Sequence, residues 1–406
     1  MKILVVTQYF YPEEFKINDL VKGLVDRGHE VVVLTCKPNY PKGKFYKGYK
    51  FWGVKEETLY GAKVIRVPVI PRGNGKSLRL VLNYFSFVFF SCLYVLCHRL
   101  RPDRIFCWDT SPILQAYAGM LVNKQTKAPL SMWVQDLWPE SVSATGKIRQ
   151  KGVMSILTTM VRGIYKRFDV LFIQSRNFRK SIEEKGHFKA EYVYAPNWAE
   201  DLYTEPNNID LDKYRNLIPS GFVVMFAGNI GAAQDFGSII KAAELTRDEK
   251  DIKWVIVGEG RKRAEAQALV EHKKLGDTVT FLGRYPSYDM PSFFVHADVM
   301  LVALRDEYIF SLTIPAKTQT YMAFGKPIVS MLNGESNKVI EEAGCGFTAS
   351  AGDFKALAAN VIRAKNMPEE VLSSMGNNGR KYYDANFSKK RVIDLIAKKI
   401  ENQQKP

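Results

Sequence analysis

The chain has 406 residues, of which 46% are hydrophobic and 25% are charged, so it is long enough for two domains and too hydrophobic for a disordered protein. Its net charge of +16 lies in the first half: residues 1–190 carry 31 Lys and Arg against 14 Asp and Glu, and the remainder carries 27 against 28. The five cysteines have neither zinc-binding nor paired spacing, which argues against a zinc protein and predicts free thiols in a reducing compartment.

The one-sided basic charge predicts contact with an anionic membrane surface or a phosphate-bearing acceptor. We expect no nucleic-acid partner, because no RNP, helix-turn-helix or zinc-finger pattern accompanies the charge. The alternative is a soluble protein that is basic for no functional reason. Residues 1–10 contain a short apolar run without a small-residue cleavage site, so they do not resemble a signal peptide.

The first half predicts a parallel sheet. Residues 2–7 form a continuous apolar run, typical of a strand that is buried on both faces. A helix over 18–27 and a strand over 29–35 follow, and this order is typical of a βαβ unit. The long, basic and aromatic connection over 37–53 indicates a functional loop. Further strands are expected at 62–68, 104–108, 130–134 and 170–174.

Residues 80–97 are a candidate membrane helix. Asn83 and two serines are the clearly polar members of this segment, and its eighteen residues are at the lower limit for crossing a bilayer. Arginines and a histidine flank it on both sides. A helix that is buried in the domain or lies in the membrane interface is favoured over a spanning one, because globular α/β pattern follows directly.

The second half repeats the α/β pattern after the polar stretch 195–219. The predicted fold class is therefore α/β, with two Rossmann-like, doubly wound domains. We expect an N-terminal domain over 1–195, a C-terminal domain over 196–385, and a C-terminal helix within 386–406 that packs back towards the first domain. In the second half, strands are expected at 222–227, 253–257, 279–282, 299–304 and 327–331, with a helix over 237–246.

Strand ends in the second half carry the candidate chemistry. Neither half has a dinucleotide-binding G-x-G-x-x-G with its ribose acid, and neither has a P-loop, which argues against a dehydrogenase and a P-loop NTPase. Glycine at a strand end lets backbone N–H groups approach an anion, although each such glycine alone is as typical of a tight turn. Together they favour a phosphate-bearing ligand. The glycines concerned are Gly228, Gly231, Gly258, Gly260 and Gly283.

Segment 310–329 predicts a helix whose first turn binds an anion. Ser311 and Thr313 can cap the helix, Pro315 can open it, and Lys317 adds a positive charge to its first turn. This combination can stabilise a leaving diphosphate without a metal ion. The alternative is a capped helix with a solvated lysine.

Several segments resemble glycosyltransferase family 4, a group of retaining enzymes that use sugar nucleotides. In the first half, WVQDLWPE at 133–140 and QYFYPE at 8–13 are similar to a subgroup that builds O-antigen and capsule, including WbuB-like L-fucosaminyltransferases. The matching stretches of the second half are APNW at 195–198, AGNIG at 227–231, VGEGR at 257–261, VTFLG at 279–283 and the segment 315–327.

The resemblance implies a GT-B fold, in which two Rossmann-like domains face each other across a cleft. It implies transfer with retention of a sugar, an N-acetylated amino sugar such as L-FucNAc from a UDP donor, onto a polyprenyl-diphosphate-linked saccharide. It also implies that neither a metal ion nor another cofactor is needed. The protein would then be peripheral or monotopic at the cytoplasmic face of the inner membrane.

Position by position, the resemblance implies that Lys317 and the turn 228–231 hold the diphosphate, and that Arg284 contacts the base. Asp136 would face the transferred sugar or the acceptor hydroxyl and act with Lys317 in catalysis; its alternative is a cap for the helix near Pro139. Glu140 and Asp109 are weaker catalytic candidates. The expected donor-binding residues are Gly228, Asn229, Ile230, Gly231, Gly258, Arg261, Gly283, Arg284, Thr313, Ile314, Pro315, Lys317 and Thr320.

The sequence departs from the family pattern at the donor site. The usual pair of glutamates falls on Leu312 and Thr320, the usual basic residues fall on Asn229 and Gln234, and the frequent histidine falls on Gln135. The donor contacts must therefore differ from the family's. Two alternatives stay open: a non-hydrolysing sugar-nucleotide epimerase of the same fold, and an inactive membrane-bound partner protein whose site has decayed.

Overall fold

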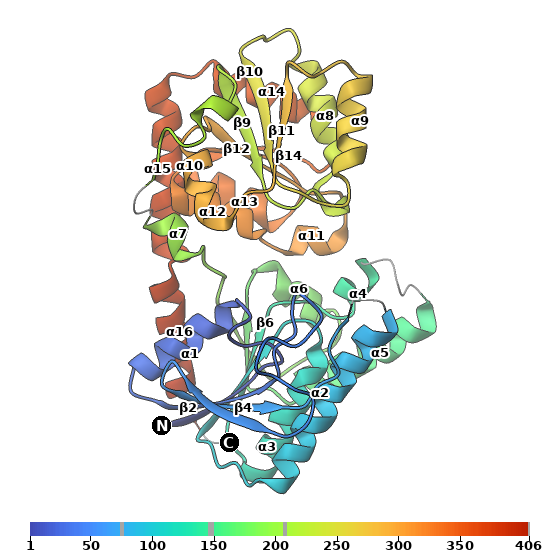
Figure 1. Ribbon diagram of the computed structural model, residues 1–406. Helices are drawn as coiled ribbons and strands as arrows, with labels where there is room; N and C mark the ends of the chain where they lie inside the picture. The colour runs from blue at the N-terminus through green and yellow to red at the C-terminus, as the bar shows by residue number, and fades with distance from the viewer. Residues whose placement is uncertain (74–76, 145–149, 206–208, 405–406) are drawn as a thin grey trace. The chain divides into compact units, whose positions relative to one another are not determined.

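The protein forms two compact units in this computed structural model (Figure 1). Unit 1 comprises Met1–Pro196 and Val392–Pro406, and unit 2 comprises Asn197–Arg391. The expected α/β fold with two doubly wound units is confirmed, since each unit is built on one parallel or nearly parallel sheet. The structure describes residues 1–73, 77–144, 150–205 and 209–404.

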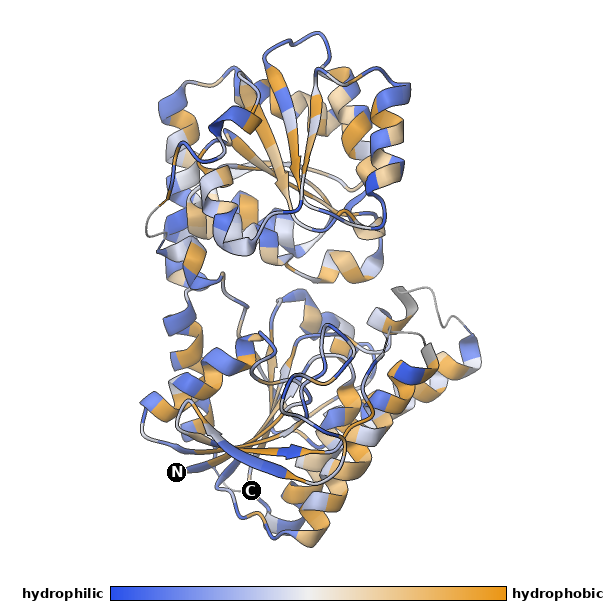
Figure 2. Cartoon of the chain, viewed as in Figure 1, coloured by the Kyte–Doolittle hydropathy of each residue, from blue (hydrophilic) through white to orange (hydrophobic). Residues whose placement is uncertain are grey.

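Unit 1 contains an eight-stranded sheet in the order β3-β4-β2-β1-β5-β6-β7-β8. All neighbouring strands are parallel except β3 and β4, which form an antiparallel pair at one edge. The central strands are hydrophobic along their length because helices cover both faces (Figure 2). The strands are β1 (Lys2–Val6), β2 (Glu30–Cys36), β3 (Lys55–Leu59), β4 (Ala62–Val67), β5 (Arg104–Asp109), β6 (Leu130–Val134), β7 (Val170–Ile173) and β8 (Glu191–Tyr194).

The last helix, α16, belongs to unit 1 from Val392 onwards although it ends the chain. Its apolar side, which includes Val392 and Ile396, is buried. Arg27 pairs with Asp394 and Glu401 of this helix at 3.0 Å each. The helices of unit 1 are α1 (Lys16–Asp26), α2 (Ser77–Cys97), α3 (Ala116–Thr126), α4 (Glu140–Ala144), α5 (Lys151–Tyr165), α6 (Asn177–Glu183) and α16 (Lys389–Glu401).

Unit 2 contains six parallel strands in the order β11-β10-β9-β12-β13-β14, so the chain direction across the sheet reverses between β9 and β12. In sheets of this kind, ligands bind outside the carboxyl ends of the strands near that reversal. The strands are β9 (Phe222–Ala227), β10 (Ile252–Val257), β11 (Val279–Gly283), β12 (Val299–Ala303), β13 (Ile328–Met331) and β14 (Gly346–Ala349).

Helices cover both faces of the unit 2 sheet, and one continuous core lies between the sheet and α8, α9 and α14. Trp254 and Phe226 are fully buried in this core. The helices are α7 (Asp201–Thr204), α8 (Phe236–Leu245), α9 (Arg263–His272), α10 (Met290–Phe294), α11 (Tyr308–Leu312), α12 (Ala316–Phe324), α13 (Glu335–Ala343), α14 (Phe354–Lys365) and α15 (Glu369–Asn386).

Helix α2 contains the segment that was expected to be buried or to lie in a membrane interface. Burial of the whole helix is wrong, because Leu78, Phe85 and Phe89 are 73%, 59% and 63% exposed. Within the described part of the chain, α2 is the one helix with the length and hydropathy to cross a membrane, a test that a core helix of a soluble protein also passes.

Candidate functional site

A cavity of about 940 Å³ lies in unit 2 at the carboxyl ends of β9, β10 and β11. The first turn of α12 and the short helices α7 and α10 complete its wall. It is large enough for a nucleotide-sized ligand. The lining residues are Tyr203, Ala227, Gly228, Asn229, Val257, Gly258, Glu259, Arg284, Tyr285, Pro286, Ser287, Met290, Phe294, Ala316, Lys317, Thr320 and Tyr321.

Lys317 places an isolated positive group in this cavity. Its Nζ atom is out of contact with solvent and has no hydrogen-bond partner among the residues that the structure describes. The same atom lies 3.4 Å from the centre of the Phe226 ring, so the aromatic face is its nearest stabilising group. Burial disfavours the charged form and lowers the pKa of Lys317 to about 7. An anion that enters the cavity would therefore stabilise the protonated lysine.

Two glycines at the strand ends make room for this arrangement. A Cβ atom on Gly228 would lie 2.8 Å from Cε of Lys317, so a larger residue there would displace the lysine side chain. A Cβ atom on Gly258 would lie 1.9 Å from the carbonyl oxygen of Gly228, and both glycines have positive φ. Glycine is thus required at both turns by close packing.

The amides of Gly228, Gly231 and Gly258 are not free to bind an anion, contrary to the expectation. The amides of Gly228 and Gly258 donate to the carbonyl oxygens of Val257 and Gly283 at 2.8 Å and 2.7 Å. The amide of Gly231 donates to the side chain of Gln234 at 3.1 Å. For Gly228 and Gly258 the reason is that the hydrogen-bond ladder of the sheet continues past the last strand residue into the turn.

The amides that stay available lie elsewhere. In the first turn of α12, Thr318 donates its amide to the carbonyl of Pro315, whereas the amides of Ala316 and Lys317 have no acceptor within the described residues. The amide of Asn229 is likewise without an acceptor in the described ranges. A diphosphate would therefore be held by Lys317, the start of α12 and Asn229.

The predicted side-chain caps of the α12 helix are wrong. The hydroxyl of Ser311 donates to the carbonyl of Tyr308, and that of Thr313 to the carbonyl of Phe310, so both point back into α11. Pro315 is the N-cap residue of α12, and no side chain caps that helix. The cause is the separate short helix α11, whose last turn competes for both hydroxyls.

The structure brings about half of the expected donor residues to the cavity wall. Gly228, Asn229, Gly258, Arg284, Lys317 and Thr320 line it. The remaining expected residues are not in its lining. Ile230 is fully buried in the core and Arg261 is exposed. The others belong to chain segments close to the lining residues: Gly231, Gly283, Thr313, Ile314 and Pro315.

The sequence interpretation missed several residues of the wall. Tyr203 and Phe294 stack with ring centres 5.6 Å apart, and Tyr285 packs against Phe293. Tyr285 follows Arg284 at the end of β11, so the strand-end rule could have identified it. Tyr203 comes from the polar linker after residue 195, where no periodic pattern marks it.

The carboxyl edge of the unit 1 sheet holds two neighbouring carboxyl groups. Asp136 follows β6 and accepts the amide of Ser111 at 2.8 Å, so it stabilises the turn after β5. Both carboxyl oxygens of Asp109 are buried without a hydrogen-bond partner. Burial, helped by the charge of Asp136, raises the pKa of Asp109 well above its usual value. Asp109 is therefore the neutral member of the pair, and Asp136 is half-buried.

Glu140, the other weak catalytic candidate, has a structural role. Its carboxylate accepts from Nζ of Lys185 at 2.5 Å and from the hydroxyl of Ser181 at 2.9 Å. Both partners belong to or directly follow α6. Both contacts are made by the same carboxylate oxygen, Oε1, and they fix α4 to α6.

Arg72 lies near Asp136 in a cage of tyrosine rings. Its guanidinium donates to the hydroxyl of Tyr9 at 2.7 Å and lies 5.1–5.9 Å from the ring centres of Tyr9, Tyr40 and Tyr84. No carboxylate of the described residues pairs with it. Both Arg72 and Asp136 influence the pKa of Tyr84, which burial raises. A cation without a counter-ion thus lies at the same sheet edge as Asp136.

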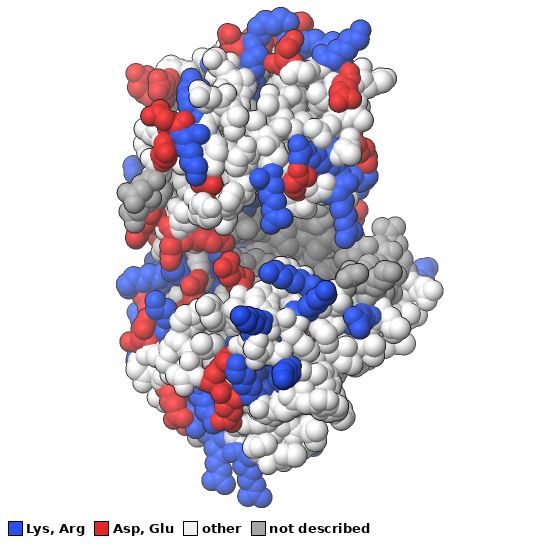
Figure 3. Space-filling model, in the orientation of Figure 1, with Lys and Arg blue, Asp and Glu red and all other residues white. Residues whose placement is uncertain are grey.

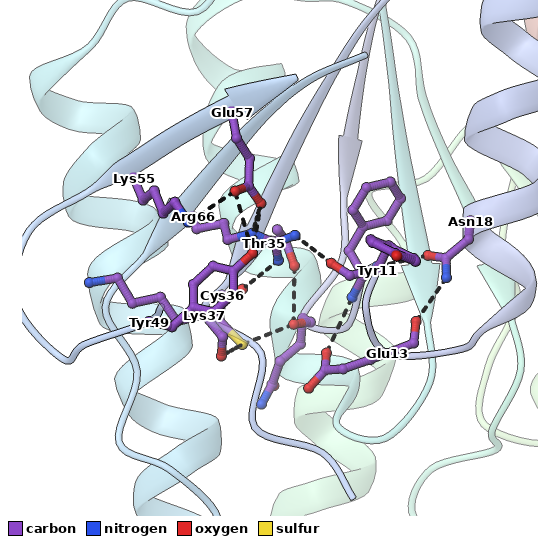
Figure 4. A network of polar contacts seen from close by, with 12 residues as sticks. Tyr11, Glu13, Asn18, Thr35, Cys36, Lys37, Tyr49, Lys55, Glu57 and Arg66 are labelled. Atoms are coloured by element: carbon purple, nitrogen blue, oxygen red, sulfur yellow. Dashed lines mark hydrogen bonds and ion pairs between the residues drawn. The ribbon is translucent and has the colours of Figure 1, made fainter. Parts of the chain in front are cut away.

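Glu13 holds the loops that carry this cage (Figure 4). Its carboxylate accepts the amides of Asn39 and Tyr40 at 2.7 Å each, and the amide of Phe10 at 3.3 Å. Asn18 closes the same loop by donating to the carbonyl of Glu13 at 2.8 Å. Burial raises the pKa of Glu13 to about 7. Asn18 and Asn39 therefore serve to position the loops.

No group of three or more His, Cys, Asp or Glu side chains that could hold a metal ion occurs in the described part of the chain. All five cysteines are free: Cys36, Cys107 and Cys345 are buried, and Cys92 is half-buried.

Comparison with known proteins identifies the enzyme class. The model "Glycosyl transferase 4-like domain" matches residues 15–198, and "Glycosyl transferases group 1" matches residues 221–366. WcaI of Escherichia coli (strain K12), which bears the name of a colanic acid biosynthesis glycosyl transferase, is 27% identical over 97% of this chain and 98% of its own. WbjE of Pseudomonas aeruginosa, named as a glycosyltransferase, is 26% identical over 80% of this chain and 82% of its own.

Solved structures show the same fold. HepE of Anabaena, solved with UDP and glucose, aligns with a TM-score of 0.68 at 16% identity and covers 99% of this chain and 100% of its own. Its likeness shows that the architecture is GT-B. The two matched domain models divide the chain where the two units do, and the two relatives match 97% and 80% of it. This chain therefore belongs to the family 4 glycosyltransferases, which are enzymes that use nucleotide sugars.

Proposed function

We propose that the protein transfers a sugar from a UDP donor, with retention, onto a lipid-linked saccharide during synthesis of a surface polysaccharide. The observation that carries the donor side is Lys317, an isolated cation at the wall of a nucleotide-sized cavity. HepE, solved with UDP and glucose, has the same fold and supports UDP as the carrier. The name of WcaI refers to colanic acid biosynthesis and supports a polysaccharide product.

The donor diphosphate would lie against Lys317 and the free amides of Asn229 and Ala316. During transfer, the bond between the anomeric carbon and the diphosphate oxygen breaks, and UDP leaves with the bonding electrons. Lys317 and the start of α12 stabilise the charge that develops on the leaving oxygen. Because this positive charge comes from the protein, we propose a reaction that needs no metal ion.

The acceptor would be bound by unit 1. The acceptor hydroxyl attacks the anomeric carbon from the face that the diphosphate leaves, and its proton passes to Asp136 or to the departing phosphate. Asp136 is suited to this because it is half-buried and next to Asp109, which burial keeps neutral. Arg72 supplies a positive charge for the diphosphate of a polyprenyl-linked acceptor.

The donor sugar that we propose is an N-acetylated amino sugar such as L-FucNAc, on the basis of the resemblance at 133–140 and 8–13 to L-fucosaminyltransferases. We place the reaction at the cytoplasmic face of the inner membrane. The excess of basic residues in the first half and the exposed apolar side of α2 support that location.

One assay tests the proposal. The purified protein is incubated with UDP, GDP and dTDP sugars, with and without a polyprenyl-diphosphate-linked saccharide, and nucleoside diphosphate release is followed. We expect UDP release that depends on the acceptor, and a product with the anomeric configuration of the donor by NMR. Conversion of the nucleotide sugar without acceptor would instead indicate an epimerase. A protein whose thermal midpoint shifts with no nucleoside diphosphate would have lost its donor site.

A further inference from the structure

Helix α2 presents an apolar side outward, unlike a helix on the surface of a soluble protein. Its buried side is mixed: Phe87 and Val95 are buried beside the polar residues Asn83, Ser86 and Ser91. Its outward side is apolar, with residues at spacings of three and four along all of its turns. The exposed apolar residues are Leu78, Val81, Leu82, Phe85, Phe89, Leu93 and Leu96; we call them the α2 stripe.

The polar residues of α2 fix which side faces outward. The side-chain amide of Asn83 donates to the carbonyl of Ile70 at 2.6 Å and accepts from Gln8 at 2.7 Å, and Ser86 accepts the amide of Ile70 at 2.9 Å. Rotation of the helix would bury the stripe but leave these buried polar groups without partners, which is unfavourable. The stripe is therefore an exposed surface that the hydrogen bonds of the fold hold in place.

A small pocket of about 290 Å³ lies beside the second half of α2. The ring of Phe51 contacts that of Phe90 at 5.9 Å between ring centres, and Glu56 accepts from the hydroxyl of Tyr94 at 3.3 Å, so the loop and β3 next to the pocket both touch this helix. The pocket is lined by Lys37, Gly48, Tyr49, Lys50, Trp52, Val54 and Lys55; we call it the lysine pocket.

The lysine pocket has positive charge in excess. Lys37 donates to the carbonyl oxygens of Phe51 and Trp52, and burial and the charge of Lys55 lower its pKa. Within the described residues, no carboxylate pairs with Lys37 or Lys50. Lys55 shares Glu57 with Arg66 and Tyr49, as Figure 4 shows around Glu57. A phosphate in the pocket would supply the missing negative charge.

Trp52, at the rim of this pocket, is 80% exposed, while the five other tryptophans of the chain are at most 8% exposed. Exposed tryptophan is typical of membrane–water interfaces, where the ring lies at the level of the headgroups. Figure 3 shows a wide uncharged surface over α2 with Lys and Arg side chains at its border. Apolar area, a tryptophan and unpaired lysines thus occur on adjoining parts of unit 1.

From this juxtaposition we propose that unit 1 binds a lipid bilayer, with the α2 stripe and Trp52 in the interface and the phosphate of an anionic lipid headgroup in the lysine pocket. Charge favours a bilayer over a second copy of the chain, because the unpaired lysines that border the stripe would repel their own counterparts across a symmetric interface. The inference rests on the proposed function only for its physiological purpose, which is to bring the enzyme to lipid-linked acceptors.

Fluorescence of Trp52 tests the proposal directly. The full-length protein is mixed with vesicles of phosphatidylcholine, alone or with phosphatidylglycerol, that carry brominated acyl chains. We expect quenching that is several-fold stronger with phosphatidylglycerol, and no quenching in Trp52→Phe. Flotation of the same mixtures measures binding independently. Glycerol phosphate alone should leave the emission of Trp52 unchanged. A change in Trp52 emission with glycerol phosphate as large as the change with vesicles would mean a site for a soluble phosphate and overturn the proposal.

Two double variants separate the parts of the surface. Phe85→Ser with Phe89→Ser should abolish flotation with both vesicle types, and Lys50→Gln with Lys55→Gln should remove the preference for phosphatidylglycerol. Matched controls are Leu217→Ser with Leu245→Ser, which are exposed apolar residues of unit 2, and Lys22→Gln with Lys180→Gln on α1 and α6. Both controls should float like the wild type.

Three results would overturn the membrane surface. They are a wild type that stays in the soluble fraction with both vesicles, a phenylalanine double variant that floats unchanged, and a wild-type dimer in sedimentation that the phenylalanine substitutions dissociate. Sugar transfer to a detergent-solubilised acceptor is measured as well, because this activity needs no bilayer and therefore tests the transferase proposal separately from the membrane proposal. The phenylalanine double variant should retain that activity. If the wild type lacks the activity, the transferase proposal is contradicted but the membrane proposal is not.

Discussion

Near the carboxyl edge of the unit 2 sheet, Lys317 is a buried cation with no hydrogen-bond partner among the described residues, whereas at the equivalent edge of unit 1 the carboxyl group of Asp109 is buried without one. Burial pushes both towards their neutral forms, since it lowers the pKa of the lysine and raises that of the aspartic acid. Only Lys317 lines a large cavity, where an anion can restore its charge. We therefore propose that the unit 2 sheet receives the anionic donor and that the unit 1 sheet presents Asp136 to the acceptor hydroxyl.

A second lysine shows that burial alone does not make Lys317 special. Lys326, just after the other end of α12, donates to the carbonyl oxygens of Val295 and Ala297 at 3.0 Å and 2.7 Å. Burial lowers the pKa of Lys326 as well. Because its hydrogen bonds are satisfied by the fold, Lys326 is the structural counterpart of Lys317.

The largest effect is expected for Lys317→Met. We expect kcat/KM to fall about 10³-fold, because the charge that stabilises the leaving diphosphate is lost. The thermal midpoint should not fall, since the buried ammonium makes no hydrogen bond in the free protein. Lys326→Met should show the reverse: a lower midpoint, with activity per folded molecule unchanged. Wild-type activity in Lys317→Met would contradict the functional difference between the two lysines.

Asp136→Asn should have the next largest effect, a fall in kcat of about 10²-fold, because an amide cannot accept the acceptor proton. The amide oxygen can still accept from Ser111, so the fold should be retained. UDP affinity, measured by calorimetry, should be unchanged. A large loss of UDP affinity would place Asp136 on the donor side.

Arg72→Gln should raise the KM for a polyprenyl-diphosphate-linked acceptor about tenfold and leave the donor KM unchanged, as expected for a charge-assisted contact with phosphate. With a saccharide acceptor that lacks the diphosphate, the variant should match the wild type. Arg99→Gln, an exposed arginine beyond the other end of α2, is the control. An equal loss with both acceptors would mean that Arg72 only supports its tyrosine cage.

The smallest effect concerns stability and pH. Because the pKa of Asp109 is raised in the folded state, the unfolded chain loses this proton first, and the folded state becomes less stable as pH rises above about 4. Asp109→Asn removes that dependence. Its thermal midpoint should exceed that of the wild type by a few degrees at pH 8, and the difference should vanish near pH 4. A midpoint below the wild type at pH 8 would contradict the neutral state of Asp109.

The fold was predictable because buried parallel strands leave an unambiguous apolar pattern. The strands β1, β2, β9 and β10 are such runs, and each was expected within one or two residues. The edge strand β3 (KEETL) was missed because three consecutive charged residues begin it and leave no apolar run. The packing of the last helix on unit 1 has a sequence signal, its amphipathic pattern, but the partner of its apolar side is set by tertiary structure.

The site was only partly predictable, for reasons of hydrogen bonding. A glycine at a strand end signals close approach of the backbone, but the sequence does not tell whether its amide is free, and those of Gly228 and Gly258 are not. The position of Lys317 in the first turn of α12 followed from the helix pattern, whereas its burial against Phe226 did not. The outward position of the apolar α2 stripe likewise depends on partners distant in sequence, such as Gln8 for Asn83.

The central claim is that Lys317 is the cation that receives the donor diphosphate. Calorimetry of UDP binding at pH 7, in two buffers with different ionisation enthalpies, tests it most directly. We expect the wild type to take up a fraction of a proton on binding, because free Lys317 has a pKa of about 7, and its affinity to weaken as pH rises above 7. Lys317→Met should bind more weakly and lack that uptake. Equal affinity and equal proton uptake in the two proteins would contradict the account.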